Sequence, residues 1–311
     1  MAEIQVNRPE GEVRVRPESI AVVELTLYPS WYPDSTQSIG DTDKIRGDLA
    51  LQSIAAGQAN GYRIVVADGD SSTAFKEELA KYTAITYVGR QEETRGAGRR
   101  QGFLVASAID GVEVIIRTEP EKVSIVSEYA PQITLPILEG KADIVVPKRN
   151  PNLHQSTYPL YQWESEVSAN KKYNDLLHKT GLLPEDQSLD MFFGPIAFRN
   201  VPEILELFLE KYEFTLPSSI GIRKFVEPEN WSDGYFFSVV KALHQGLKVV
   251  SVEVDFKYPE KQRQNEETTA QGAIDEFVAK RAQQKWGLLD ELIHFIRYLR
   301  QDPKSGLKKI E

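Results

Sequence analysis

The chain has 311 residues, of which 41% are hydrophobic and 27% are charged, and its formal net charge is −9. This composition is typical of a globular protein with a sizeable core, and the acidic balance argues against general affinity for nucleic acids or anionic membranes. Because there is no cysteine, disulfides, thiolate metal sites and cysteine nucleophiles are excluded. No apolar run is long enough for a membrane-spanning helix, and residues 1–19 lack the apolar core of a signal peptide. These features predict a soluble, cytoplasmic protein.

Apolar runs that predict strands alternate along the chain with segments of helical apolar spacing. The expected elements are, in chain order, strand 19–27, helix 43–60, strand 62–67, helix 73–81, strand 84–88, helix 96–109, strand 112–116, helix 125–138, strand 142–147, helix 161–179, a strand or turn in 189–199, helix 202–212, helix 231–245, strand 248–256 and helix 274–300. Such alternation is typical of a parallel, wound sheet. We therefore expect an α/β fold with a mostly parallel central sheet flanked by helices. Its parts would be an N-terminal arm (1–18), one main domain (19–267) and a C-terminal helical extension (268–311).

Two carboxylates follow the expected strand 112–116. Side chains alternate along an extended chain, so Glu119 and Glu121 would point to the same side. Ligands of open α/β sheets usually bind at the carboxyl ends of the strands, where two carboxylates could hold Mg²⁺ or Mn²⁺, and the cation a phosphate. An alternative interpretation makes both glutamates solvated loop residues.

Glycines and arginines alternate at the start of the expected helix 96–109, where Gly96, Arg99 and Arg100 stand close together. Glycine lets the backbone approach a ligand, a helix N-terminus offers N–H groups to an anion, and arginine binds phosphate through two nitrogens. The pattern therefore predicts a phosphate site, although an ordinary basic surface loop would look the same.

Further polar residues stand at the ends of expected elements. Asp68 follows the second strand in an Asp-Gly turn signal. Asp190 precedes an apolar run, where it could cap a turn or take part in chemistry. Asp233 lies near the start of an expected helix, and a polar tail with Lys261 and Arg263 follows the last strand.

Over residues 19–267 the order of these motifs resembles that of the GT-A (Rossmann-like) nucleotide-sugar glycosyltransferases, especially family-2-type enzymes and polyprenyl-phosphate mannose synthases. The resemblance implies transfer of a hexose, mannose or glucose, from a nucleoside diphosphate sugar, with a GDP-sugar favoured over a UDP-sugar. Glu119-Pro120-Glu121 stands where the family has its Asp-x-Asp metal motif. This departure puts the need for a divalent cation in doubt.

The same resemblance implies a role for each candidate residue. Asp68 would contact the base or ribose, and the diphosphate would be bound by Gly96, Arg99 and Arg100. The tail with Lys261 and Arg263 would fold over the donor phosphates, Glu119 and Glu121 would ligate a metal, and Lys122 would contact the leaving diphosphate. In an inverting reaction, Asp190 or Asp233 would accept the acceptor's proton.

Two other functions stay open. A nucleotidyltransferase acting on a sugar phosphate has a similar sheet, but its usual glycine-rich loop after the first strand is missing, since residues 25–34 contain no glycine. A non-catalytic binding protein of the same fold is the second alternative. Without a membrane span a lipid acceptor is not indicated, so we expect a small-molecule or glycan acceptor. The C-terminal helix could pack on its own domain or pair with a second copy in a homo-oligomer.

Overall fold

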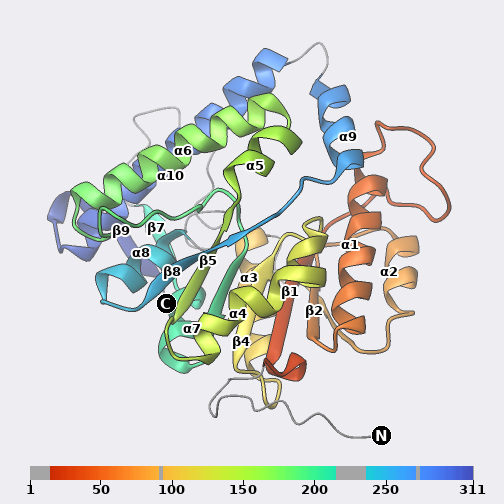
Figure 1. The fold of residues 1–311 in the computed structure, drawn as a ribbon, viewed down its shortest axis with the longest axis horizontal. Helices are drawn as coiled ribbons and strands as arrows, with labels where there is room; N and C mark the ends of the chain where they lie inside the picture. Colours follow the sequence, from red (N-terminus) through yellow and green to blue (C-terminus); the bar gives the residue numbers. More distant parts are fainter. Residues whose placement is uncertain (1–14, 91–93, 215–235, 271–273, 311) are drawn as a thin grey trace, which may run out of the picture.

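The computed structural model describes residues 15–90, 94–214, 236–270 and 274–310, and a mixed β-sheet lies at its centre (Figure 1). Seven strands of the described chain form this sheet, in the order β3 (Ile85–Gly89), β2 (Arg63–Asp68), β1 (Ile20–Thr26), β4 (Val114–Thr118), β6 (Ile196–Arg199), β5 (Ile144–Arg149) and β8 (Val249–Val254). Neighbouring strands run parallel except at β6, which is antiparallel to both β4 and β5. The parallel strands therefore present their carboxyl ends along one edge of the sheet.

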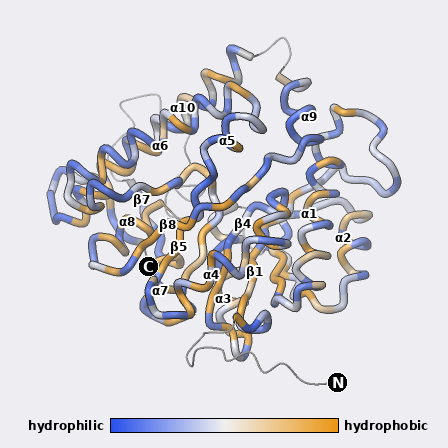
Figure 2. Tube along the Cα trace, in the orientation of Figure 1, coloured by the Kyte–Doolittle hydropathy of each residue, from blue (hydrophilic) through white to orange (hydrophobic). Residues whose placement is uncertain are grey.

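Helices cover both faces of the sheet because the strands alternate apolar side chains between two cores. Val23 of β1 packs in a cluster with side chains of α3 (Arg95–Ser107), α7 (Pro202–Leu209) and α8 (Phe237–His244). Its neighbour Val22 belongs to a second cluster with α1 (Thr42–Ala59) and α4 (Ala130–Leu138). Figure 2 shows the hydrophobic residues concentrated along the central strands.

The outer helices complete the molecule. α6 (Leu160–Lys179) and α10 (Ile274–Leu299) lie alongside each other in Figure 1, and α9 (Glu260–Ala270) lies next to α1. Phe295 of α10 is fully buried in the same cluster as Tyr173 of α6, so the C-terminal helix packs on its own chain. The remaining described elements are α2 (Thr73–Leu79), α5 (Pro151–Thr157), a π-helical turn (Ile125–Tyr129), two 3₁₀ turns (Pro17–Ser19 and Pro303–Ser305) and the pair β7 (Lys211–Phe214) and β9 (Leu307–Ile310). No helix in the described ranges has the length and apolarity required to cross a membrane.

The α/β class with a mostly parallel central sheet flanked by helices is confirmed. Three local predictions are wrong. The helix expected over 202–212 ends at Leu209, because the following residues pair as β7 with the distant β9. The polar tail after the last strand contains helix α9. A short helix, α5, was missed although Asn150 caps it and Pro151 opens it.

Candidate functional site

A cavity of about 550 Å³ opens at the carboxyl ends of β1 and β4. This is the edge at which open α/β sheets bind ligands. Five of the described helices also contribute to its wall: α1, α3, α6, α9 and α10. The charged side chains that line it are Asp43, Arg46, Arg90, Arg99, Arg117, Glu119, Glu121, Lys122, Glu166, Glu266, Arg281 and Lys285.

The Glu-Pro-Glu segment forms a turn at the floor of this cavity. Strand β4 ends at Thr118, and the backbone N–H of Lys122 donates to the carbonyl of Glu119 at 3.0 Å. Proline at the second position is favoured in such turns. The expected extended alternation of Glu119 and Glu121 is therefore wrong. Both residues line the cavity, but each contacts different partners.

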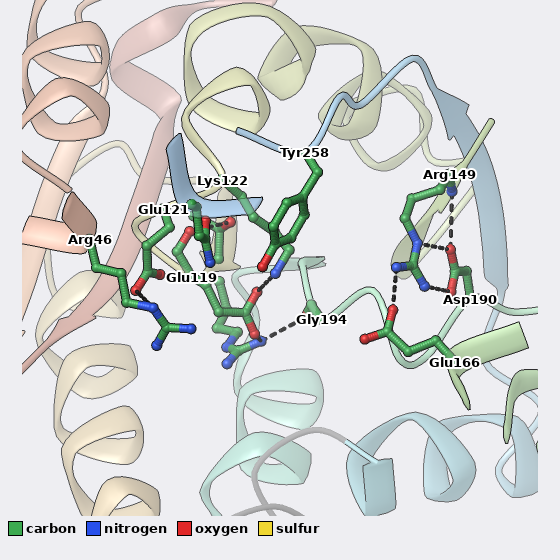
Figure 3. Close-up of polar contacts among 12 residues, drawn as sticks. Arg46, Glu119, Glu121, Lys122, Arg149, Glu166, Asp190, Gly194 and Tyr258 are labelled. Carbon is green, nitrogen blue, oxygen red and sulfur yellow. Dashed lines mark hydrogen bonds and ion pairs between the residues drawn. The ribbon is translucent and has the colours of Figure 1, made fainter. Parts of the chain in front are cut away.

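Glu119 is held between two cations. Its Oε1 lies 2.8 Å from Arg117 Nη1, and its Oε2 lies 2.7 Å from Lys122 Nζ. Burial raises the pKa of Glu119, but Arg117 and Lys122 outweigh it and lower the value to about 2. Behind the carboxylate lies Gly194, whose carbonyl accepts a 2.7 Å hydrogen bond from Arg117 (Figure 3). Gly194 has φ +103°, and a Cβ there would collide with Glu119.

Glu121 belongs to a second group of contacts on the other side of the turn (Figure 3). Its Oε1 accepts a 3.3 Å hydrogen bond from the hydroxyl of Tyr28 and lies 3.9 Å from Arg46 Nε. Arg46 also donates to Glu266 of α9 at 3.1 Å, and Tyr258 donates to the same carboxylate at 2.8 Å. Burial and Glu121 raise the pKa of Tyr28, so its hydroxyl stays a donor.

These two carboxylates do not suit a divalent cation. Both oxygens of Glu119 are engaged by cationic nitrogens, and the face of the carboxylate lies against Gly194. Mg²⁺ and Mn²⁺ need several oxygen ligands around them. Among the residues that the structure describes, no three His, Cys, Asp or Glu side chains are grouped so as to hold a metal ion.

The glycine–arginine segment places part of its charge at the cavity. Arg99 of α3 lines the wall, whereas Arg100 and Gly96 are buried and do not. Arg90, which precedes the helix, lines the wall too. Its side chain lies between two glycines: a Cβ at Gly69 would lie 1.0 Å from Arg90 Nη2, and one at Gly98 would lie 2.4 Å from Arg90 Cδ.

Asp68 lies outside the cavity lining and organises the loop after β2. Its carboxylate accepts hydrogen bonds from the hydroxyls of Thr26 (2.7 Å) and Ser71 (2.5 Å) and from the backbone of residues 70 and 71. The side chain is only 2% exposed. These contacts are those of a loop-stabilising residue.

Asp190 also lies outside the cavity lining, in a separate buried cluster (Figure 3). Arg149 donates hydrogen bonds to both its oxygens, from Nε to Oδ2 at 2.8 Å and from Nη2 to Oδ1 at 2.7 Å, and the side-chain amide of Asn170 donates to Oδ1 as well. The same guanidinium contacts Glu166 of α6, which does line the cavity. Burial raises the pKa of Asp190, but Arg149 outweighs it and lowers the pKa below its usual range.

Helix α9 turns a different face to the cavity from the one the sequence suggested. Gln262 and Glu266, one turn apart, line the wall. Lys261 is exposed and does not line it, and Arg263 contacts Glu260 and Glu267 of its own helix. The remaining candidate, Asp233, lies outside the described residues.

Several cavity residues were not found from the sequence. Arg46 lies near the start of α1 and belongs to no motif, and Tyr258 lies in the polar tail after β8, of which only Lys261 and Arg263 were chosen as candidates. Lys285 lies one turn after Arg281 on α10 and donates to Ser165 at 2.8 Å. Burial lowers the pKa of Lys285 to about 8, with help from Arg281 and Arg149. The only available signal was basic residues at helical spacing, which is typical of solvent-exposed helices.

Comparisons with known proteins add a general likeness. No family model and no curated protein matches the chain. Similar solved structures include a mannosyltransferase from Pyrobaculum calidifontis in complex with GDP-Man and Mn²⁺ (11% identity, TM-score 0.44, 94% of this chain and 77% of that one). A 4-diphosphocytidyl-2C-methyl-D-erythritol synthase from Anaerococcus prevotii has 12% identity and TM-score 0.44 over 83% and 97% of the chains. A cytidylyltransferase from Leptospira borgpetersenii has 13% identity and TM-score 0.40 over 93% and 96%. Similarities this weak do not identify an activity, so the function has to be argued from the residues of this chain.

Proposed function

We propose that this protein is a transferase that binds a nucleoside diphosphate sugar in the cavity and moves its hexose to a small-molecule or glycan acceptor. One observation carries the proposal. Within the described part of the chain, seven cationic side chains and five carboxylates line the cavity, although the whole protein has a net charge of −9. A cationic cavity in an acidic protein favours an anionic ligand, and its place at the strand ends is typical of nucleotide sites.

Four basic side chains of the cavity lining suit a diphosphate. Arg117 and Lys122 project from the end of β4, and Arg90 and Arg99 line the same cavity. Guanidinium groups match the geometry of phosphate oxygens, and fixed positive charge stabilises a departing diphosphate. The preference for a guanine base rests on the sequence resemblance to mannose synthases, and it stays part of the proposal.

Other parts of the cavity lining suit an acceptor. There Phe192 offers an aromatic surface, while Gln162 of α6 and Lys285 of α10 offer polar groups. An inverting reaction needs a carboxylate that takes the acceptor's proton. Asp190 is engaged by Arg149 and Asn170, so Asp233 stays the proposed base of the two.

The loop after β1 favours hexosyl transfer over nucleotidyl transfer. A glycine-rich loop binds phosphates through free backbone N–H groups. Here the N–H of Tyr28 donates to Ser71, that of Ser30 to Asp43 and that of Trp31 to the carbonyl of Tyr28. These three donors are already used inside the protein.

Calorimetric titration with GDP, UDP and CDP tests donor binding. We expect one nucleotide to bind with micromolar affinity and Lys122→Gln to weaken it by about tenfold, as expected for a lost charged hydrogen bond. Lys81→Gln is the matched control, since Lys81 pairs with Glu78 at the same sequence spacing but on the surface. No binding of any nucleotide would reject the proposal and leave a non-catalytic binding protein.

The products of two incubations separate the two transferase classes. One contains a nucleoside diphosphate sugar and an acceptor, and the other a nucleoside triphosphate and a sugar phosphate. Hexosyl transfer from a nucleoside diphosphate sugar releases a nucleoside diphosphate. Nucleotidyl transfer to a sugar phosphate consumes a nucleoside triphosphate and releases pyrophosphate. Detection of pyrophosphate alone would replace hexosyl transfer by the nucleotidyltransferase alternative.

A further inference from the structure

The Glu-Pro-Glu turn brings two cations together with its two carboxylates. Within it and beside it lie Arg117 and Lys122, whose nitrogens contact the two oxygens of Glu119 at 2.8 and 2.7 Å. Arg117 is fixed further by the carbonyl of Gly194 at 2.7 Å. Both cations are mostly buried, with side chains 8% and 17% exposed. Two cations thus lie against the carboxylate of Glu119 at the wall of the cavity.

The local charges disfavour an added metal ion. A divalent cation ligated by Glu119 would stand within a few ångströms of a guanidinium and an ammonium in a poorly solvated site, where like charges repel strongly. It would also have to replace nitrogens that already use both carboxylate oxygens. A diphosphate in the same place would add negative charge beside these cations instead.

We propose that Arg117 and Lys122 take the place of a divalent cation at the donor diphosphate, and that Glu119 positions these two cations instead of ligating a metal. The inference rests on the proposed function for the identity of the donor. The geometry divides the work between the cations. Arg117 is anchored to backbone and stays in place, whereas Lys122 Nζ has one carboxylate contact, lies 5.6 Å from the centre of the Phe193 ring, and can turn toward the phosphates.

The chemistry balances without a metal. The bond between the sugar's anomeric carbon and the β-phosphate oxygen breaks, and its electron pair stays on the diphosphate. The acceptor oxygen forms the new bond to that carbon, and its proton passes to a base or to water. The charge gained by the leaving oxygen is stabilised by Arg117, which is held in place, and by Lys122, which turns toward the phosphates.

Binding of pyrophosphate, GDP, UDP and CDP in buffer containing EDTA tests this inference. Pyrophosphate is included because it has no nucleobase, so its binding reports on the phosphate site alone. We expect binding without metal, about tenfold weaker in Lys122→Gln and largely restored in Lys122→Arg, because the charge is the active feature. Glu119→Gln should weaken this metal-free binding severalfold, because Arg117 and Lys122 lose the carboxylate that positions them, whereas a residue that only ligated a metal would not affect binding in EDTA. Circular dichroism confirms that each variant is folded.

A second measurement examines the metal directly. Titration of the protein with Mn²⁺ alone, followed by the electron paramagnetic resonance signal of the free ion, should show no micromolar site. Tight Mn²⁺ binding that Glu119→Gln abolishes, or ligand binding that occurs only with Mn²⁺, would overturn the inference and leave the transferase proposal intact. Pyrophosphate binding without binding of any nucleotide would reject the nucleotide-sugar donor but keep the cationic site. Absence of all binding would reject both.

Discussion

Gly194 lies directly against the carboxylate of Glu119, so that a Cβ at this glycine would stand 2.5 Å from Oε1 and 2.7 Å from Oε2. The contact links the segment before β6 to the turn after β4. It also leaves the carboxylate in one position, with Arg117 and Lys122 on its two oxygens. The order of the cationic site therefore depends on a residue without a side chain.

Replacement of Gly194 by alanine should be more costly than backbone strain alone explains. We expect Gly194→Ala to lose about 1–3 kcal/mol from its left-handed backbone, and more from the collision with Glu119. Gly246→Ala is the control, because its φ is +75° and nothing lies within 4 Å of the new Cβ. Urea unfolding of both variants gives the difference. Equal losses would show that Glu119 moves aside without cost.

Asp190 is expected to act through stability. Asp190→Asn removes the carboxylate that Arg149 Nε and Nη2 contact and leaves the guanidinium only Glu166 as an acidic partner; hydrogen bonds to charged groups each contribute about 1.5–3 kcal/mol. We therefore expect Asp190→Asn to lower the free energy of unfolding substantially, while nucleotide affinity of the folded protein changes little. Asp175→Asn, in an exposed pair with Lys171, should change stability by about 0.5 kcal/mol or less. Loss of activity in a stable, nucleotide-binding Asp190→Asn protein would instead support a role in catalysis.

Glu24 should make the stability depend on pH. It is fully buried on β1 and accepts a hydrogen bond from Ser53. Burial raises its pKa from 4.5 to about 8, with a further increase from Glu121. Between these values the folded state keeps a proton that the unfolded state has lost, so stability falls as pH rises, by at most about 1.4 kcal/mol per unit.

Glu24→Gln should flatten this fall between about pH 5 and 8, since glutamine carries no titrating proton. Unfolding free energies measured across this range provide the check. The exposed Glu77→Gln serves as the control. An unchanged slope in Glu24→Gln would mean that other groups produce the pH dependence.

Basic residues of α9 and of α1 should differ in their effect on ligand binding. Lys261 and Arg263 lie away from the cavity, so their joint replacement by alanine should change nucleotide affinity by less than about twofold. Arg46→Ala should weaken it by about tenfold, because Glu121 and Glu266 lose their shared cation and would repel a diphosphate. Calorimetry compares the two proteins. A tenfold loss in the Lys261/Arg263 variant would restore the role expected from the sequence.

Much of the fold could be predicted because its elements are encoded locally. The strands around Val23 and Ile115 are β-branched runs, and their alternation between two cores follows from the geometry of a strand. The strand β7 could not be predicted, since its partner β9 lies almost a hundred residues away. Local propensity there agrees with a helix, and tertiary pairing decides the outcome.

The candidate site could be located but not resolved from the sequence. The position of Glu119 after a buried strand correctly placed it at the cavity. Its charge partners depend on a turn at Pro120, which breaks the alternation that the prediction used. The ion pair of Asp190 was harder to predict, because its partner Arg149 lies 41 residues earlier in the chain and no local sequence pattern indicates such a pair.

The two glycines beside Arg90 make the effects of substitutions at three positions of the chain depend on one another. Neither Gly69 nor Gly98 has a left-handed φ, so neither is required by its own backbone, and a helical glycine such as Gly98 even costs about 1 kcal/mol. At each position the arginine occupies the space that a Cβ would take: at Gly69 with its guanidinium end, which can shift, and at Gly98 with Cδ and Cγ, which lie nearer its backbone. Alanine at 98 should therefore be more harmful than alanine at 69 while position 90 is arginine, and neutral or stabilising once position 90 is small. Whether alanine at 69 or 98 raises or lowers the stability therefore depends on the residue at position 90. A sequence profile that scores each position separately would attribute these glycines to backbone conformation, although the cause is the neighbouring side chain.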